Sequence, residues 1–229
     1  EIEAAVEAAF RSRGARRPGF ETIAGGGARA CVLHYVENDA RVPEDGLLLL
    51  DAGAEVDYYH GDVTRTLPAS GRFTPRQRDV YELVLAALRS AVAAVRPGAT
   101  IGAVHDAAVR TLTTGLVELG VLAGDVDALV SEGAHKPFFP HQTSHWLGLD
   151  VHDPGDYARA GESRTLEAGM VFTVEPGLYF RPGTGAESPG AFEGIGVRIE
   201  DDVVVTADGC EVLTSALPTA PDEVEADTE

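Results

Sequence analysis

Residues 47–67 read LLLLDAGAEVDYYHGDVTRTL, and this stretch predicts a strand hairpin. Its two strands are expected at Leu47–Glu55 and Tyr58–Leu67, because leucine, β-branched and aromatic residues fill a pleated, half-buried surface well. The turn is expected between Val56 and Asp57. Because the two strands of a hairpin run antiparallel, the stretch predicts a sheet that contains antiparallel strands.

Two aspartates stand in this hairpin. With the turn between residues 56 and 57, Asp51 on the first strand would lie directly opposite Asp62 on the second. Like charges directly opposite each other destabilise a strand pair. Asp51 also follows four leucines, so its side chain is expected to be buried, and a buried unpaired carboxylate is costly. The hairpin therefore predicts a cation between the two carboxylates.

Three further potential metal ligands, His145, Glu175 and Glu200, stand beside apolar or β-branched runs. Any one of them alone is an ordinary turn or strand-end residue. Together with Asp51 and Asp62 they make four carboxylates and one imidazole, which two divalent cations would neutralise. This composition favours a hydrolase with two metal ions.

Three histidines, His141, His145 and His152, lie within twelve residues of one another, in a segment with aromatic residues and glycine. Their spacing is not His-Glu-x-x-His, so a helical zinc protease site is not indicated. Arg198 precedes Glu200 by two residues, and the two side chains therefore share one strand face. Arg198 can pair there with a carboxylate of the cluster or of a substrate.

The rest of the chain predicts helices between two groups of strands. Capping residues and apolar periodicity predict helices over Ile2–Arg13, from Thr74 to Pro97, from Thr100 to Gly120 and near Asp125–Glu132. Strands are expected at Ala30–Val36, Gly169–Phe180 and Gly196–Val205. This order predicts an α+β fold of two similar halves around a central sheet. Residues from Pro218 onward hold five acids and are expected to be loosely attached.

Length and composition indicate one large globular domain. The 229 residues are 44% hydrophobic, and their net charge of −19 argues against binding to nucleic acid. Apolar runs are strand-sized, so no membrane role is expected. Two cysteines do not make a disulfide framework, which favours a reducing, cytoplasmic setting. The chain opens at Glu1 inside a helical pattern, and we expect it to be a piece of a longer protein.

Several motifs together resemble those of Xaa-Pro aminopeptidases (aminopeptidase P), which belong to the creatinase, prolidase and methionine aminopeptidase superfamily. They are CVLHYVEN (31–38), LDAG (50–53), GDVTRT (61–66), SHWLGLDVHD (144–153), TVEPG (173–177) and VRIEDD (197–202). The resemblance implies the pita-bread fold, with two pseudo-symmetric halves around a curved, mainly antiparallel sheet. It implies a catalytic domain at 1–217 whose start is trimmed and which lacks the family's N-terminal domain, followed by an acidic tail at 218–229.

The resemblance also implies a role for each site residue. Asp51 would bind the first metal ion, Asp62 and Glu200 would bridge both, and His145 and Glu175 would hold the second. A water or hydroxide between the metals would attack the carbonyl before proline, with Glu175 taking its proton. His34 and His152 would form hydrogen bonds with the substrate carbonyl or the tetrahedral intermediate. His141 would contact the proline side of the substrate, and Arg198 would orient the metal-binding carboxylates or the substrate. The metals are expected to be Mn²⁺, with Co²⁺ or Zn²⁺ as substitutes.

The implied activity is removal of an N-terminal residue from peptides with proline at the second position. The nearest alternative is a prolidase, which cleaves Xaa-Pro dipeptides, although Ser144-His-Trp-Leu-Gly resembles the aminopeptidases more. A non-catalytic binding protein on the same fold and a metal-free creatine hydrolase fit the five ligands less well. Gln142-Thr143 stands where Gly-Leu is frequent in relatives, which can alter the pocket wall. The full-length protein is expected to form homo-oligomers.

Overall fold

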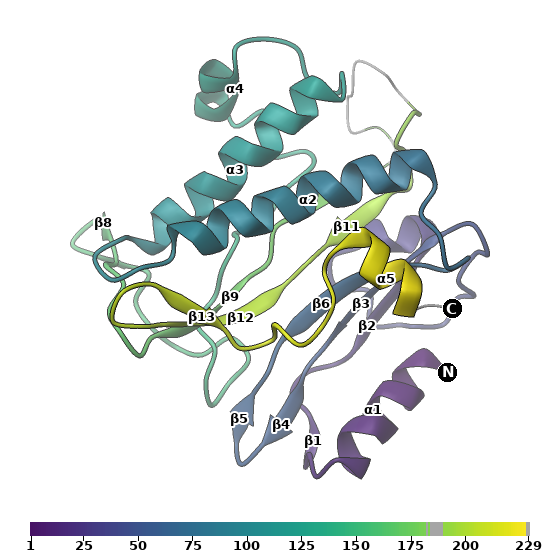
Figure 1. Cartoon of the computed structure of the whole chain (residues 1–229), viewed down its shortest axis with the longest axis horizontal. Helices are drawn as coiled ribbons and strands as arrows, with labels where there is room; N and C mark the ends of the chain where they lie inside the picture. Colours follow the sequence, from purple (N-terminus) through teal and green to yellow (C-terminus); the bar gives the residue numbers. More distant parts are fainter. Residues whose placement is uncertain (182, 184–189, 228–229) are drawn as a thin grey trace.

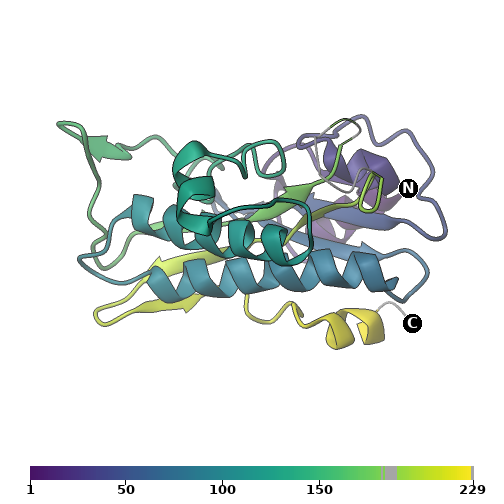
Figure 2. The same ribbon diagram turned by 90° about the horizontal axis from the view of Figure 1, so that it is seen from above.

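The structure, a computed structural model, describes residues 1–181, 183 and 190–227 of the chain. Two long helices, α2 (Pro75–Ala94) and α3 (Ile101–Glu118), lie side by side across the strands (Figures 1 and 2). The main core lies between these helices and the strands of the second half of the chain. All strand pairs in the described part of the chain are antiparallel, as the predicted α+β fold requires.

The first half of the chain forms the predicted hairpin, but in a different register. β3 (Leu47–Ala52) pairs with β6 (Val63–Pro68), and β4 (Ala54–Val56) pairs with β5 (Tyr59–His60). Asp51 faces Thr64, so the predicted pairing with Asp62 is wrong. The turn lies at Asp57 and Tyr58, whose φ angles of 50° and 72° suit a tight hairpin turn.

The new register keeps the two aspartates together. Asp62 stands directly before β6, two residues ahead of Thr64, and its side chain lines the same cavity as that of Asp51. The hairpin is interrupted at Gly53, where an added Cβ would lie 1.7 Å from the carbonyl oxygen of Gly61. Only glycine allows this close approach of the two backbones. Flanking strands complete two small sheets: β2 (Ile23–Gly26) beside β3, and β1 (Arg17–Pro18) beside β4.

The two strands predicted in the second half are each broken into two. Residues 169–180 form β9 (Val171–Val174) and β10 (Gly177–Tyr179), and residues 196–205 form β11 (Gly196–Arg198) and β12 (Asp201–Val205). β12 pairs with β9 and with β13 (Cys210–Val212), whereas β10 pairs with β11. The first break holds Glu175 and Pro176, and proline cannot donate to a strand ladder. The second break holds Glu200, so both breaks fall on predicted metal ligands.

The helices follow their predicted caps. Thr74 and Gln77 form a capping box at α2, Thr100 caps α3, and Asp125 caps α4 (Val126–Glu132). The helix α1 (Ile2–Ser12) also lies where it was expected. The predicted strand at residues 30–36 is wrong, because the 3₁₀ helix η1 (Gly27–Cys31) occupies its start. Two short strands, β7 (Ala158–Arg159) and β8 (Glu162–Ser163), form a separate hairpin.

The acidic C-terminal segment is docked, which corrects the expectation of loose attachment. Residues Pro221–Asp227 form α5, and Val224 is 1% exposed within the main core. Arg65 donates to the carbonyl oxygens of Leu217 and Pro218 at 3.2 and 2.9 Å. The buried Val224 side chain and the ion pairs of Arg78 with Asp222 and Glu225 hold α5 in place. Residues 228 and 229 lie outside the described part, and a domain boundary at residue 217 stays a prediction.

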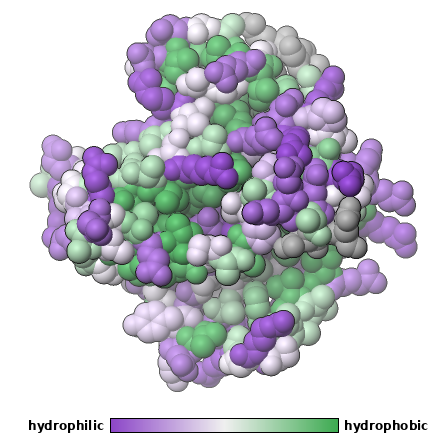
Figure 3. Space-filling view, viewed as in Figure 1, coloured by the Kyte–Doolittle hydropathy of each residue, from purple (hydrophilic) through white to green (hydrophobic). Residues whose placement is uncertain are grey.

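The surface mixes hydrophilic and apolar side chains. On the face seen in Figure 3, hydrophilic side chains lie along the rim and between apolar ones. No helix among the described residues has both the length and the apolar character needed to cross a membrane. Cys31 and Cys210 are free thiols.

Candidate metal centre

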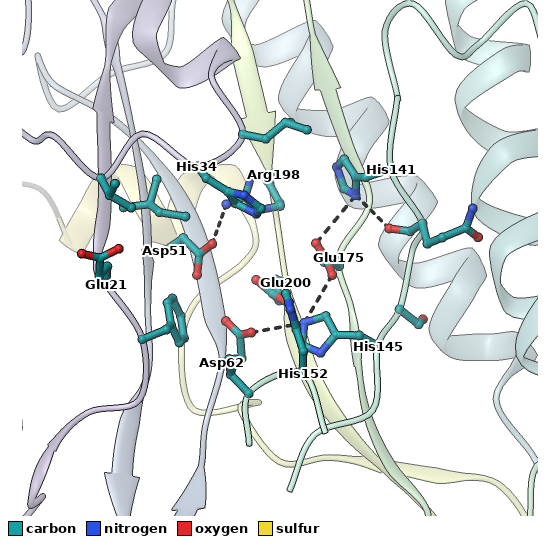
Figure 4. Close-up of a pocket in the computed structure, with 17 residues that line it drawn as sticks. Glu21, His34, Asp51, Asp62, His141, His145, His152, Glu175, Arg198 and Glu200 are labelled. Carbon is teal, nitrogen blue, oxygen red and sulfur yellow. Dashed lines mark hydrogen bonds and ion pairs between the residues drawn. The ribbon is translucent and has the colours of Figure 1, made fainter. Parts of the chain in front are cut away.

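All nine residues predicted for the site line one cavity of 480 Å³ (Figure 4). They are His34, Asp51, Asp62, His141, His145, His152, Glu175, Arg198 and Glu200. They come from both halves of the chain: the hairpin supplies the aspartates, and the two strand breaks supply the glutamates. The histidines at 141, 145 and 152 come from an irregular segment that is held to β9 by the bridge between Trp146 and Phe172.

Three of the five predicted ligands form a compact group. One ligand atom each of Asp62, His145 and Glu200 lies within 4.8 Å of the other two. His145 Nε2 lies 3.3 Å from Asp62 Oδ2 and 3.5 Å from Glu175 Oε1. The Nδ1 atom lies 3.2 Å from its neighbour's carbonyl oxygen, at Trp146, and donates to it. This bond leaves the Nε2 lone pair directed to the carboxylates, which is the arrangement of a metal-binding histidine.

Asp51 is held by the buried guanidinium of Arg198. Arg198 is 2% exposed, and its Nη2 lies 2.5 Å from Asp51 Oδ2. Its other nitrogens donate to the hydroxyl oxygens of Thr64 and Tyr179, both at 3.0 Å. The other carboxylate oxygen of Asp51, Oδ1, is buried and has no hydrogen-bond partner among the described residues. The same is true of Asp62 Oδ1. Two such orphaned carboxylate oxygens are unfavourable unless a cation binds them.

If all the carboxylates of the cavity were ionised, they would carry more negative charge than Arg198 alone can balance. Burial, followed by the charges of Asp51 and Asp202, raises the pKa of Asp62 to about 9. Burial and the neighbouring carboxylates raise the pKa of Glu200 well above its ordinary value. Burial also raises the pKa of Glu175 to about 7, although His145 and Arg198 oppose the shift. A donor set that resists ionisation without a cation fits divalent metal ions.

Two histidines beside the group, His141 and His152, are held neutral. Burial and the charge of Arg198 lower the pKa of His141 to about 3, and its Nε2 lies 2.8 Å from the Tyr179 hydroxyl. Burial and the neighbouring His145 lower the pKa of His152, whose ring centroid lies 4.4 Å from that of His145. In Figure 4, His34 lies beside Arg198, across the cavity from His145.

Sequence reasoning missed the residues that orient the ligands. The Thr64 hydroxyl donates to Glu200 Oε2 at 2.6 Å, and Arg65 donates to the Glu200 carbonyl oxygen at 2.6 Å. Asp202 accepts the backbone N–H of Asp62 at 3.1 Å. Their place in the motifs GDVTRT and VRIEDD was the available signal. Their contacts join residues more than 130 positions apart, so the spacing of residues in the sequence could not predict these contacts.

Known metallopeptidases match most of the chain. Residues 1–207 match the model of metallopeptidase family M24. The chain is 49% identical to the Xaa-Pro aminopeptidase of Escherichia coli over 225 residues, and 37% identical to human Xaa-Pro aminopeptidase 3 over 224 residues. Each alignment covers 98% of this chain, but only 50% and 43% of the relative. The chain therefore spans about half the length of these curated relatives.

Solved structures give the same result for the fold. An aminopeptidase of Pseudomonas aeruginosa matches with a TM-score of 0.94 at 51% identity, covering 98% of this chain and 51% of that one. Aminopeptidase P of E. coli with the inhibitor Pro-Leu matches with a TM-score of 0.94 at 49% identity, with the same coverage. These matches confirm the pita-bread fold predicted from the motifs.

Proposed function

Because the chain belongs to metallopeptidase family M24, we propose that it is the catalytic part of an Xaa-Pro aminopeptidase with two divalent metal ions. The observation that carries this proposal is the cavity in which four acidic ligands and His145 meet, with three of the acids resisting ionisation. The names of the relatives support the aminopeptidase over a prolidase and over a non-catalytic binding protein.

The five ligands divide into three groups in this proposal. Asp51 would hold the first ion, Asp62 and Glu200 would be shared by both, and His145 and Glu175 would hold the second. Four carboxylates and one imidazole make an oxygen-rich set, which suits Mn²⁺, while Co²⁺ and Zn²⁺ remain able to substitute. When bound, the ions would supply Lewis acidity that lowers the pKa of water and stabilises negative charge on a carbonyl oxygen.

The chain's own residues would then bind and orient the peptide. Glu175 would accept the proton of the attacking water. His34 and His152 would donate hydrogen bonds to the carbonyl oxygen of the bond before proline. His141 is neutral, and its two ring nitrogens are hydrogen-bonded to Gln142 O and Tyr179 Oη, so it would present a rigid ring to the proline side of the substrate. Arg198 would keep Asp51 aimed at its ion.

The expected substrates are peptides with proline at the second position. The binding of the inhibitor Pro-Leu to aminopeptidase P of E. coli supports a pocket for proline on the downstream side of the reacting bond. Homo-oligomers of the full-length protein and a cytoplasmic location remain part of the proposal.

Peptide hydrolysis tests the proposal. With Mn²⁺ present, the protein should release alanine from Ala-Pro-Gly and leave Ala-Ala-Gly intact. Asp62→Ala should lower kcat/KM by at least about 100-fold, because it removes a ligand shared by both ions. Asp79→Ala, at an exposed site on α2, is the matched control and should keep the parent rate. Cleavage of the dipeptide Ala-Pro without cleavage of Ala-Pro-Gly would favour a prolidase. Cleavage of neither Ala-Pro nor Ala-Pro-Gly would contradict the proposal.

A further inference from the structure

The C-terminal segment, residues 213–227, lies against the strands that hold the metal ligands. The backbone N–H of Leu213 donates to the carbonyl oxygen of Asp202 at 2.9 Å, and α5 packs on α2 and on β6, the strand that follows Asp62 (Figure 1). None of the segment's described residues lines the cavity of the metal centre. The match to the family model also ends before the segment, at residue 207. Its contact with the ligand strands therefore needs its own explanation.

Arg65 is the residue at which the C-terminal segment and a metal ligand meet. Its side chain is buried, and all three of its nitrogens donate hydrogen bonds. Nη1 donates to the carbonyl oxygen of Glu200 at 2.6 Å. Nε donates to the carbonyl oxygen of Pro218 at 2.9 Å, and Nη2 donates to that of Leu217 at 3.2 Å. One rigid, planar group thus connects the backbone of the segment to the backbone of the ligand.

Thr214 makes a second connection, through two buried acids. Its hydroxyl donates to Asp201 Oδ1 at 2.7 Å and accepts the backbone N–H of Asp202 at 3.2 Å. Asp201 Oδ1 also accepts from Arg65 Nη2 at 2.7 Å, so the two connections share one carboxylate. Asp202 Oδ2 in turn accepts the backbone N–H of Asp62 at 3.1 Å. The network that the segment closes therefore reaches both ligands that the two ions would share.

The far end of the C-terminal segment is held without any contribution from the metal ligands. The Tyr81 hydroxyl donates to the carbonyl oxygen of Thr219 at 3.0 Å, and Arg78 lies 3.6 Å from a carboxylate oxygen of Glu225. Val224 is buried in the main core. An undocked segment would take two acceptors away from the buried guanidinium beside Glu200, which is costly for a charged donor. The position of that ligand therefore depends on whether the segment is docked.

We propose that the C-terminal segment is a working part of the metal centre, with Arg65 as the positioning residue that holds Glu200 in its metal-binding place while the segment is docked. Coupling between two sites is reciprocal, so bound metal ions strengthen the docking of α5 by the same factor by which docking strengthens metal binding. The proposal rests on the metal-binding part of the proposed function and does not depend on peptide hydrolysis.

Hydrogen exchange of the full chain, followed by mass spectrometry with and without saturating Mn²⁺, tests this coupling. Amides of α5 exchange through local opening, and Mn²⁺ should slow their exchange about tenfold in the parent. In Arg65→Lys the slowing should fall below about threefold, because lysine keeps the charge but cannot hold both the segment and Glu200. Arg89→Lys, at an exposed position of α2, should keep the parent slowing. The helix α4, also of seven residues and packed on α3, should show no slowing by Mn²⁺.

Calorimetric titration with Mn²⁺ gives the reciprocal measurement. The Kd for Mn²⁺ should rise about tenfold in Arg65→Lys and stay at the parent value in Arg89→Lys. If Arg65 served stability alone, Arg65→Lys would lower the Tm of the metal-free protein but leave the effect of Mn²⁺ on α5 intact. Equal slowing of α5 in the parent and in Arg65→Lys, or no slowing in the parent, would therefore overturn the proposal.

These measurements separate the proposal from the proposed function. A parent that shows the metal-dependent slowing of α5 but releases no alanine from Ala-Pro-Gly would refute the peptidase and leave the coupling in place. A parent that binds no Mn²⁺ would overturn both. If Arg65→Lys does not fold, Thr214→Val replaces it, since it removes the second connection, with Thr114→Val on α3 as the matched control. Parent slowing of α5 in Thr214→Val would then overturn the proposal.

Discussion

Arg198 is the residue on which the metal centre's geometry depends most. It is the buried cation nearest the acidic ligands, and its three nitrogens each meet a different partner: Asp51, Thr64 and Tyr179. The sequence placed Arg198 on the face of Glu200 and left open whether it meets a carboxylate of the cluster or of a substrate. The structure shows that it meets Asp51. Its partner Tyr179 could not be predicted, because nothing in the order of the chain brings β10 to this arginine.

Arg198→Lys tests this orientation. Lysine keeps the charge but cannot aim three donors in fixed directions, so Asp51 should lose its alignment. We expect kcat/KM for Ala-Pro-Gly to fall between about 10-fold and 100-fold, the range typical of partners that orient metal ligands. Arg89→Lys, at an exposed position of α2, should keep the parent value. Parent activity in Arg198→Lys would show that Asp51 needs no such support.

At the scale of elements, the sequence predicted the helices better than the strands. Thr74, Thr100 and Asp125 are local signals, and each caps a helix in the structure. Strand register depends on turn geometry, and the left-handed turn at Asp57 and Tyr58 moved Asp51 opposite Thr64. The breaks at Glu175 and Glu200 also escaped prediction, because apolar runs continue through them.

The docking of α5 was the other element that sequence reasoning missed. Its acids suggested a solvated tail, but Val224 is buried in the main core. Val224→Ala should lower the free energy of unfolding by about 2 kcal/mol, since it removes two buried methyl groups and leaves a cavity. Urea denaturation measures the loss. Glu223→Ala, on the exposed side of α5, is the control, and equal stability of both variants would contradict the docking.

At the scale of the whole molecule, the carboxylates of the metal centre repel one another when they are ionised, and this repulsion destabilises the folded chain. The raised pKa values of Asp62, Glu175 and Glu200 belong to acids that the folded chain prefers to keep protonated. Unfolded, these groups ionise near pH 4, so between about pH 4 and pH 9 the metal-free folded state binds more protons than the unfolded state. The stability of the metal-free protein should therefore fall as the pH rises through this window.

Metal removal combined with pH tests this conclusion. The Tm of EDTA-treated protein should fall from pH 5 to pH 8.5, and added Mn²⁺ should raise Tm by roughly 5 °C or more at pH 8.5, with a smaller rise at pH 5. The metal binds the ionised carboxylates, which accounts for the direction. Asp62→Asn removes one of the titrating acids, so its metal-free Tm should fall less over the same range. A metal-free Tm that stays constant or rises with pH would refute the argument.

The central claim is that the acidic cluster holds two metal ions, and counting bound metal tests it most directly. Metal-free protein is dialysed against saturating Mn²⁺, and the bound metal is measured by inductively coupled plasma mass spectrometry. The parent and Asp62→Asn are compared. The account predicts two Mn²⁺ per chain in the parent and at most one in Asp62→Asn, which lacks a bridging carboxylate. No bound metal in the parent, or two ions retained by Asp62→Asn, would contradict it.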